Sequence, residues 1–167
     1  MPSVPLPFDP IGEAQRRWEA HGWGEAAPGM AAVTSIMRAH QLLLQRIDEQ
    51  LRGFGLTFAR YEVLMLLHFS RRGSLPMSVI GSRLQVHPTS VTSAVDRLER
   101  QGLVRRVAHP TDGRARLAEL TDAGRDLALE ATSRLNATVF AQPGLESDEI
   151  EVLIGVLRGL RERAGDF

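Results

Sequence analysis

The sequence predicts a mainly α-helical protein that carries one small β-hairpin. Apolar residues recur at helical spacing over residues 30–51, 122–139 and 147–160, which places long helices toward both ends of the chain. Three shorter helical stretches lie between them, and two runs of alternating apolar and charged residues follow the third. Three helices followed by a basic hairpin are the elements of a winged helix-turn-helix. The expected fold is therefore a winged helix-turn-helix with long N- and C-terminal dimerisation helices.

The first helix is expected to begin after a proline-rich start. Asp9 can cap it, and Pro10 suits the first helical position because its φ is fixed and its missing N–H needs no partner there. The helix runs to about Ala20, where residues 21–24 (His-Gly-Trp-Gly) interrupt it. Residues 1–29 are accordingly an N-terminal extension with a leading helix.

The second helix is expected from Met30 to Leu51, with a stop at the glycines of residues 53–55. Its apolar residues form one continuous stripe, which offers more apolar surface than a small domain needs. The helix therefore either spans the domain or meets a second copy of the chain. Residues 30–55 and 122–167 are assigned to a helical dimerisation region.

Short elements follow and form the expected winged helix-turn-helix domain, residues 56–121. Thr57 caps a buried helix that ends near Gly73. Residues 74–75 are expected to form a short strand against the hairpin. Pro76 opens the next helix, and a short turn leads from it into the third.

Both ends of the third helix are specified by local residues. It begins at Pro88 and ends before Gly102, where a left-handed residue can close it. If Gly102 closes a Schellman turn, Leu98 and Leu103 make the hydrophobic contact that accompanies such a turn. One side of the helix is apolar and the other is displayed to solvent. The apolar side holds Val91, Ala94, Val95 and Leu98, and the displayed side holds Thr89, Ser93, Asp96, Arg97 and Arg100, with Ser90 at its margin.

The hairpin is expected from residues 103–108 and 116–120, joined by turn residues over 109–114. Arg114 and Arg116 lie at or beside its tip.

Two further helices are expected after the hairpin. Thr121 with Asp122 caps the first, and Ser147 with Asp148 caps the second.

The charge of the chain is balanced overall but unevenly distributed. Twenty basic and twenty acidic residues give a formal net charge of zero, so there is no general attraction to polyanions. Six arginines nevertheless lie between Arg97 and Arg116, whereas residues 146–151 are acidic. Contact with nucleic acid would have to come from this local cluster of arginines.

Composition and motifs disfavour several classes of protein. The absence of cysteine excludes disulfides, thiol redox sensing and cysteine-ligated zinc or iron–sulfur sites. No apolar run is long enough to cross a bilayer and no secretory signal begins the chain, so we expect a cytoplasmic protein without a membrane partner. No nucleophile motif, phosphate-binding loop or paired-carboxylate segment is present, so we expect no enzyme. The histidines are not paired at helical spacing, so we expect no metal and no cofactor.

The displayed side of the third helix is short, hydroxyl-bearing and basic toward its end, which suits a helix in the major groove of double-stranded DNA. Arg97 and Arg114 lie on the two elements that a winged helix presents, so DNA contact is favoured over an ordinary solvated role; for Arg100 neither is favoured. Phosphates would repel Asp96 and Asp112, so each is expected to orient a neighbouring arginine, and Asp112 also to stiffen the wing. The candidate DNA-binding residues are Pro88, Thr89, Ser90, Ser93, Arg97, Arg100, Arg114 and Arg116.

Three different groups of residues follow one another along the middle of the chain. They are Leu56-Thr57 with Leu64 and Leu67, Ser90-Val91-Thr92 with residues 95–104 (VDRLERQGLV), and residues 110–115 (PTDGRA) leading to Leu120-Thr121. Together they resemble the MarR (multiple antibiotic resistance regulator) family of bacterial transcription factors over about residues 30–160. Gly113 departs from the resemblance, because the family often has a second arginine there. The resemblance implies an obligate homodimer that binds near-palindromic DNA and leaves it when a small, often aromatic or carboxylate, ligand enters a cleft.

Candidate ligand-binding residues lie around the only two tryptophans. Trp18, His21 and Trp23 are close in sequence, and Arg38 and His40 on the next helix offer groups that can hold a carboxylate. The alternative is that the tryptophans attach the leading helix to the dimer core and that His40 is an ordinary core histidine. The sequence leaves both open for Trp18, His21, Arg38 and His40.

Taken with the resemblance, the sequence predicts a sequence-specific DNA-binding transcriptional regulator of the MarR type, a homodimeric repressor released by a small anionic or aromatic ligand. The alternative is a winged-helix protein-interaction module without specific DNA binding. That alternative requires an apolar displayed face, which Thr89, Ser93 and Arg97 do not provide.

Overall fold

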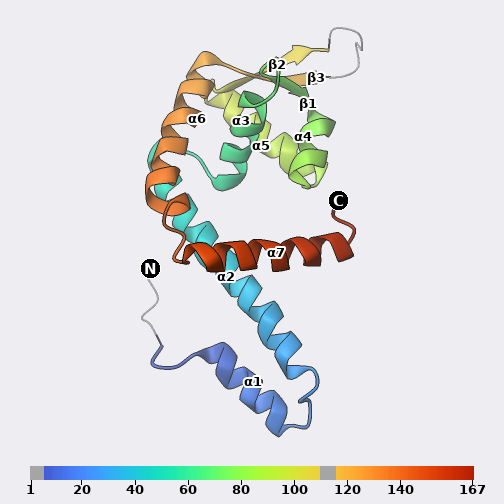
Figure 1. Ribbon diagram of the computed structural model, residues 1–167. Coiled ribbons are helices and arrows are strands. Elements are labelled where there is room, and N and C mark those ends of the chain that lie inside the picture. The colour runs from blue at the N-terminus through green and yellow to red at the C-terminus, as the bar shows by residue number, and fades with distance from the viewer. Residues whose placement is uncertain (1–5, 110–115) are drawn as a thin grey trace. The chain divides into compact units, whose positions relative to one another are not determined.

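The structure is a computed structural model that describes residues 6–109 and 116–167. It is mostly helical and contains one small antiparallel sheet (Figure 1). This confirms the predicted mainly α-helical winged helix-turn-helix fold. By internal contacts the chain divides into two compact units, residues 1–49 and 50–167. Within the described ranges, no helix is both long and apolar enough to cross a membrane.

The first unit contains α1 (Pro10–Ala20) and most of α2 (Ala27–Leu51). Asp9 caps α1 as predicted, because its carboxylate accepts a hydrogen bond of 3.0 Å from a backbone N–H in the first turn. α2 begins earlier than the predicted Met30. The predicted start was too late because it rested on apolar periodicity alone. Pro28 lies in the first turn of the helix and is tolerated there, since a backbone N–H at that position has no hydrogen-bond partner within the helix.

The second unit contains the three short helices of the predicted winged domain. They are α3 (Phe58–His68), α4 (Met77–Leu84) and α5 (Pro88–Arg100), preceded by a short 3-10 helix η1 (Arg52–Phe54). Their apolar sides meet in a core from which water is excluded. The side chains that are almost completely buried there include Leu64, Leu67, Ile80, Val91, Val95 and Leu98.

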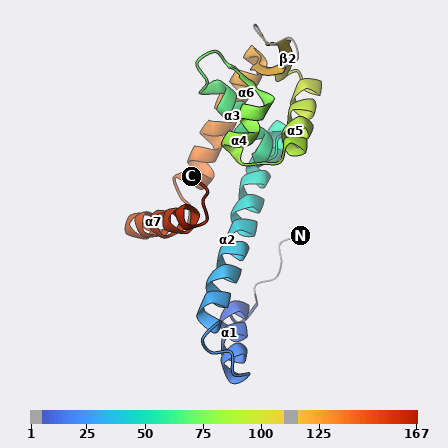
Figure 2. The same cartoon turned by 90° about the vertical axis from the view of Figure 1, so that its right-hand side faces the viewer.

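Three strands lie over these helices at one end of the second unit (Figures 1 and 2). They are β1 (Ser74–Pro76), β2 (Val104–Ala108) and β3 (Arg116–Leu120), in the order β1-β3-β2 with both pairs antiparallel. The predicted hairpin and the predicted short strand against it are both confirmed. The turn was predicted over residues 109–114, and residues 110–115 lie outside the described residues.

The remaining helical elements are α6 (Asp122–Leu135), a short π-helix labelled η2 (Asn136–Phe140) and α7 (Ser147–Arg163). Thr121 caps α6 as predicted, because its hydroxyl accepts a hydrogen bond of 3.0 Å from the Gly124 N–H. Gly124 is buried so close to the Leu103 carbonyl oxygen that a Cβ atom there would lie 2.0 Å from that oxygen. The start of α6 is thereby fixed against the chain that enters β2.

Two predicted helix caps differ in the structure. Thr57 has the extended backbone of an N-cap residue, but its side chain forms no capping hydrogen bond. The N-cap of α7 is Glu146 and not Ser147, which is the first helical residue. Glu149, three residues after Glu146, accepts a hydrogen bond of 2.9 Å from the Glu146 N–H and completes a reciprocal capping box. Ser147 has no such partner, because the residue three positions after it is apolar.

Candidate nucleic-acid interface

The start of α5 is fixed by the turn that leads into it. Gln85, directly after α4, has a left-handed φ of 53° and reverses the chain. Pro88 then occupies the first position of α5, and the Thr89 N–H donates a hydrogen bond of 3.3 Å to Nδ1 of His87, the N-cap residue. The predicted start of this helix is confirmed.

The end of α5 is a Schellman motif, as predicted. Gly102 has a left-handed φ of 72°, and its N–H donates a hydrogen bond of 2.9 Å to the Glu99 carbonyl oxygen. The Leu103 N–H donates one of 3.0 Å to the Leu98 carbonyl oxygen. Leu98 and Leu103 are both buried, so the hydrophobic contact expected of the motif is also available.

The two sides of α5 have the predicted character. Val91, Val95 and Leu98 are buried and Ala94 is half-buried, whereas Asp96 is only partly exposed. All six candidate DNA-binding residues on this helix are exposed: Pro88, Thr89, Ser90, Ser93, Arg97 and Arg100. The helix therefore presents hydroxyl and guanidinium groups along one continuous face.

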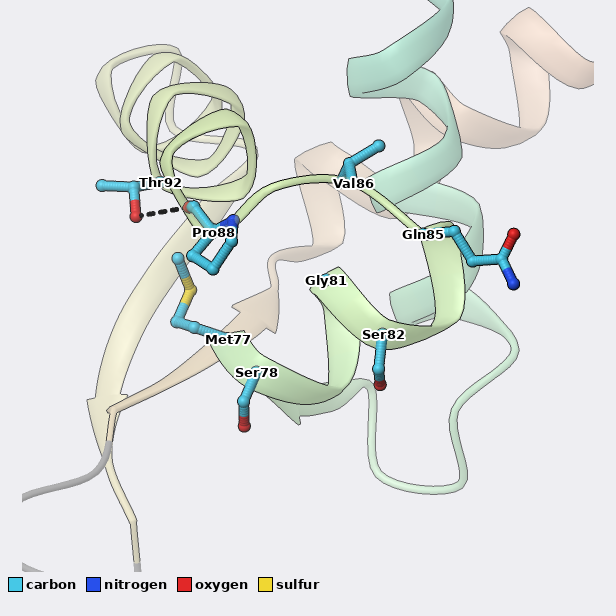
Figure 3. Close-up of a pocket in the computed structure, with 8 residues that line it drawn as sticks. All are labelled: Met77, Ser78, Gly81, Ser82, Gln85, Val86, Pro88 and Thr92. Atoms are coloured by element: carbon cyan, nitrogen blue, oxygen red, sulfur yellow. Dashed lines mark hydrogen bonds between the residues drawn. The ribbon is translucent and has the colours of Figure 1, made fainter. Parts of the chain in front are cut away.

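A cavity of about 470 Å³ lies under the turn between α4 and α5 (Figure 3). Its lining includes Met77, Gly81 and Pro88. The Thr92 hydroxyl, beside it, donates a hydrogen bond of 3.0 Å to the Pro88 carbonyl oxygen and is thus occupied by the backbone of its own helix. Thr92 is accordingly a weaker candidate for external contact than the serines of the same helix.

Three polar side chains on the exposed face of α5 have no partner in the part of the chain that the structure describes. Within residues 6–109 and 116–167, no hydrogen bond or ion pair involves the side chains of Ser90, Ser93 or Arg97. All three line a hollow of about 380 Å³ together with Thr57 and Arg60 from the start of α3. Two guanidinium groups and several hydroxyls in one hollow are suited to bind an anionic oxygen such as that of a phosphate.

Arg60 and Thr57 were not among the predicted site residues. They lie about thirty positions before the serines in sequence, and only the packing of α3 on α5 brings them to the same hollow. The sequence offered one signal, an arginine in the first turn of a helix within the domain, but such an arginine is common on solvated surfaces.

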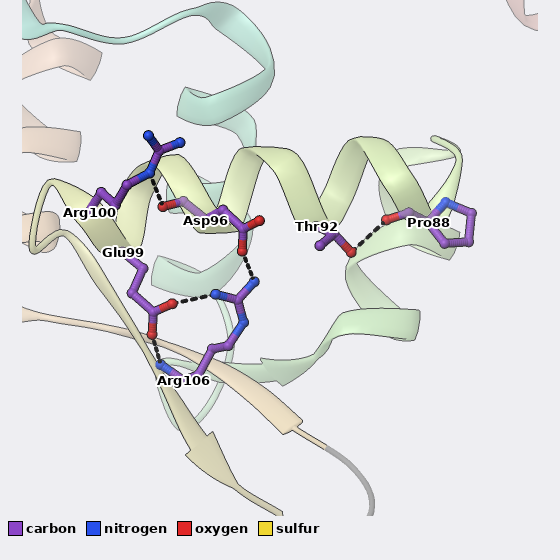
Figure 4. A network of polar contacts seen from close by, with 6 residues as sticks. All are labelled: Pro88, Thr92, Asp96, Glu99, Arg100 and Arg106. Carbon is purple, nitrogen blue, oxygen red and sulfur yellow. Dashed lines mark hydrogen bonds and ion pairs between the residues drawn. The ribbon is translucent and has the colours of Figure 1, made fainter.

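Arg106 of β2 ties the wing to α5 (Figure 4). Its guanidinium pairs with the carboxylates of Asp96 and Glu99, and its backbone N–H donates a hydrogen bond of 3.0 Å to the Glu99 carboxylate. Partial burial opposes the charge on Arg106, but the hydrogen bonds from Asp96 and Glu99 outweigh it and raise the pKa of the guanidinium. Asp96 was expected to orient a neighbouring arginine, and it pairs with Arg106. The orienting role itself stays a prediction.

The rest of the wing carries further arginines. Arg105 pairs with Glu119 across the β2–β3 ladder, and Arg116, at the start of β3, is exposed. Arg114 and Asp112 lie outside the described residues, so their assigned roles stay predictions.

The candidate ligand residues of the first unit form two separate groups. The ring of Trp23 lies 5.3 Å from that of Trp18 and 5.7 Å from that of His21, measured between centroids. On α2, Arg38 donates to a glutamine of its own helix, and His40 is exposed in the single chain. In the described part of the unit, no hydrogen bond, ion pair or ring contact joins either α2 residue to the aromatic group. The ligand site predicted at these residues therefore stays a prediction.

A helix with an exposed polar face, joined by ion pairs to a basic hairpin, defines a winged helix-turn-helix DNA-binding protein. Comparison with known proteins specifies the class further. A sequence model described as MarR family matches residues 54–115. Together with the relatives below, this match shows that the chain belongs to the MarR family of transcriptional regulators.

Three solved structures illustrate the similarity. A MarR family transcriptional regulator from Streptomyces coelicolor is 52% identical, with a TM-score of 0.76 over 84% of this chain and 97% of that one. A second regulator from the same organism, solved in complex with DNA, is 29% identical, with a TM-score of 0.68 over 78% of this chain and 84% of that one. CouR from Rhodococcus jostii RHA1, solved bound to p-coumaroyl-CoA, is 25% identical, with a TM-score of 0.65 over 75% of this chain and 87% of that one.

Proposed function

We propose that the protein is a homodimeric repressor that binds near-palindromic double-stranded DNA through α5 and the wing. The observation that carries this proposal is a set of exposed side chains on one face of α5, Ser90, Ser93 and Arg97, that have no partner among the described residues. Exposed polar side chains of this kind are suited to exchange water for base edges and phosphates. The S. coelicolor relative solved with DNA supports the same use of the fold.

Each candidate residue has a role in this proposal. Thr89, Ser90, Ser93 and Arg97 approach base edges in the major groove, and Pro88 sets the start of the helix that carries them. Arg100, Arg114 and Arg116 contact backbone phosphates, and Asp112 stiffens the wing. We add Arg60 as a further phosphate contact, because it shares a hollow with Arg97.

The dimer is proposed to form through residues 30–55 and 122–167. Support comes from large apolar side chains that stay exposed in the single chain and would be covered by a second copy. On α2 they include Val33, Ile36, Met37, Leu42 and Leu43, and on α7 Val152, Leu153, Ile154, Val156 and Leu160. Sedimentation at micromolar concentration should give a single species of twice the 18.4 kDa chain mass. A monomer that binds a full palindrome with high affinity would contradict this architecture.

Release by a small anionic or aromatic ligand is the second part of the proposal. Arg38 and His40 are accessible cationic or donor groups on α2, and Trp18 and His21 offer rings. CouR, a relative that binds p-coumaroyl-CoA, supports the idea that this fold holds aromatic acyl compounds. A ligand that releases the wild-type protein from DNA should fail to release Arg38→Ala and Trp18→Ala variants that still bind DNA. A normal response of both variants would move the pocket elsewhere.

Selection of duplexes from a random pool tests the DNA-binding proposal. The expected product is a motif with two inverted half-sites whose centres lie about 10 base pairs apart, or one turn of DNA. The same selection with an Arg97→Ala variant should return a motif that is less defined at one position of each half-site. A pool that stays random with the wild-type protein would favour the protein-interaction alternative.

A further inference from the structure

The turn between α4 and α5 contains a residue that its backbone conformation does not favour. Among the residues that the structure describes, Gln85 is the one non-glycine residue with a left-handed φ. Glycine and asparagine adopt this conformation at lower cost, so a glutamine here indicates that its side chain has a use. Figure 3 shows that side chain extending away from Pro88 and Thr92. Its Nε2 donates a hydrogen bond of 2.8 Å to the backbone carbonyl oxygen of Asp166, and the turn is thereby joined to the segment that follows α7.

The segment that accepts this hydrogen bond, residues 164–167, folds back at the end of α7 and is hereafter the α7 hook. Gly165 has a left-handed φ of 72°, and the N–H groups of Gly165 and Asp166 donate hydrogen bonds of 3.0 Å and 3.1 Å to carbonyl oxygens of the last helical turn. The Asp166 carboxylate pairs with the Arg161 guanidinium. The centroid of the Phe167 ring lies 5.9 Å and 5.1 Å from the guanidinium carbons of Arg158 and Arg161. The hook is therefore held in place by contacts of its own.

The hook holds the far end of α7 against the winged helices. No residue of α7 is buried in the single chain, so no buried side chain fixes the direction of this helix. Figure 1 shows its end beside α4, where the hydrogen bond from Gln85 reaches the hook. The apolar side chains of α7 that are assigned to the dimer end at Leu160, before the hook begins. The hook therefore links the proposed dimer helix to the turn that precedes α5.

We propose that Gln85 is a positioning residue for DNA binding, because its hydrogen bond to the α7 hook fixes the α4–α5 turn relative to α7. This inference rests on the proposed function, in which α7 joins two copies and α5 lies in the major groove. The centres of two half-sites lie about 34–36 Å apart, and one added base pair moves them by about 3.4 Å. A restrained turn keeps each α5 in the orientation that matches one spacing. The hook thus sets how strictly the dimer selects the distance between half-sites.

The strength of one hydrogen bond bounds the size of the effect. A neutral hydrogen bond changes an equilibrium by about two- to tenfold once the exchange with water is counted. A contact shifts the balance between two orientations only by the difference in its stability between them. Loss of the bond from Gln85 should therefore change the preference for one orientation of α5 by about two- to tenfold in each copy.

Hydrogen exchange tests the contact without DNA. The Val86 N–H donates a hydrogen bond of 3.1 Å to the Gly81 carbonyl oxygen at the end of α4, so its exchange rate reports on the order of the turn. Gly165→Val in the full chain opens the hook, because a β-branched residue is strained at a left-handed φ. We expect the Val86 N–H to exchange at least about twofold faster in this variant, measured by NMR. An unchanged rate would overturn the contact.

Gly22→Val is the matched control for the exchange measurement. Gly22 also has a left-handed φ, of 86°, and open space around it, but it lies after α1 in the first compact unit. Its replacement should leave exchange of the Val86 N–H unchanged. Equally fast exchange in both variants would show a general loss of stability and would contradict a contact through the hook.

Affinity for duplexes of different spacing tests the positioning role. The selected duplex is compared, by fluorescence anisotropy, with one whose half-sites are separated by one more base pair. Gln85→Met removes the donor and keeps the length of the side chain, so the preference for the selected spacing should decrease at least about fourfold, or twofold for each copy. Adding Gly165→Val should decrease it no further, because both changes remove the same hydrogen bond. A wild-type preference in Gln85→Met would overturn the positioning role.

Arg60→Ala distinguishes positioning from a simple loss of DNA contact. It removes a proposed phosphate contact, so it should weaken binding to both duplexes by one factor and leave the preference for spacing unchanged. Faster exchange of the Val86 N–H in Gly165→Val, with an unchanged preference in Gln85→Met, would leave the contact standing and refute its role in spacing. If the protein selects no duplex, the proposed function fails and the positioning role fails with it. The exchange rate then still decides whether the hook holds the turn.

Discussion

Replacing Arg106 by glutamine should loosen the wing from α5 and lower the free energy of unfolding. The substitution removes two ion pairs, to Asp96 and Glu99, that join β2 to the helix. Hydrogen bonds to charged groups contribute about 1.5–3 kcal/mol, but exposed ion pairs contribute only about 0.2–1 kcal/mol. The two carboxylate side chains are 48% and 39% exposed, which brings each pair toward the lower range. We therefore expect a loss of about 1–2 kcal/mol, seen as a decrease in Tm of about 2–8 °C.

Arg105→Gln is the matched control for this substitution. Arg105 is the neighbouring arginine of β2, its side chain is 68% exposed, and its partner Glu119 lies on the other strand of the hairpin. Its removal should cost less than about 0.5 kcal/mol. Both variants are compared by urea and thermal unfolding at one protein concentration, because the Tm of an oligomer depends on concentration. Equal losses in the two variants would refute the reasoning.

DNA binding gives a second measurement on Arg106→Gln. Without the guanidinium, Asp96 and Glu99 place two uncompensated carboxylates beside the face of α5, so affinity for the selected duplex should decrease by about tenfold. Adding Asp96→Asn and Glu99→Gln to this variant should restore part of the affinity. If it restores none, charge neutralisation is not the function of the cluster.

Three further predictions concern individual residues. Arg97→Ala should weaken the selected duplex by about 1–3 kcal/mol and relax discrimination at one base position; an equal loss on random DNA would show a phosphate contact instead. Gly124→Ala should destabilise the fold by about 3 kcal/mol or more in urea unfolding, because the added Cβ would overlap a backbone oxygen. Gly29→Ala is the control: it has open space around it and should be neutral or stabilising by up to about 1 kcal/mol. Glu62→Gln should raise stability at neutral pH, because burial raises the pKa of the folded carboxyl above 4.5. That gain should decrease as the pH falls toward 4.5 and disappear well below it, where the carboxyl is protonated in both the folded and the unfolded state. A gain that persists at low pH would contradict this reasoning.

The elements that sequence reasoning placed well are those specified by local chemistry. Pro88 and Gly102 mark the ends of α5 because a fixed φ and a left-handed φ act on the residue that carries them. Thr121 likewise caps the helix that it precedes. Ser147 was misplaced by one residue because a serine is a good cap in isolation, whereas Glu146 gains a reciprocal partner.

The contacts that sequence reasoning missed connect different elements of the fold. Arg60 reaches the α5 face only through the packing of two helices, and Arg106 reaches Glu99 only through the curvature of the chain from α5 into the wing. Each contact joins two different elements, so the period of a single helix or strand does not reveal it. The apolar stripe of α2 was found from its helical spacing, and its large side chains are exposed in the single chain. The second copy expected to cover them stays a prediction, because the spacing of one chain does not identify what covers it.

The central claim is that α5 reads DNA sequence, and the ratio of two dissociation constants tests it most directly. The measurement compares the selected duplex with a shuffled duplex of the same length and base composition, at 150 mM salt, because phosphate contacts alone make affinity depend on salt and not on sequence. We predict a preference of at least about a thousandfold for the selected duplex, with two chains bound per duplex. A ratio near one would show that the exposed face of α5 contacts only the DNA backbone, and it would contradict the account.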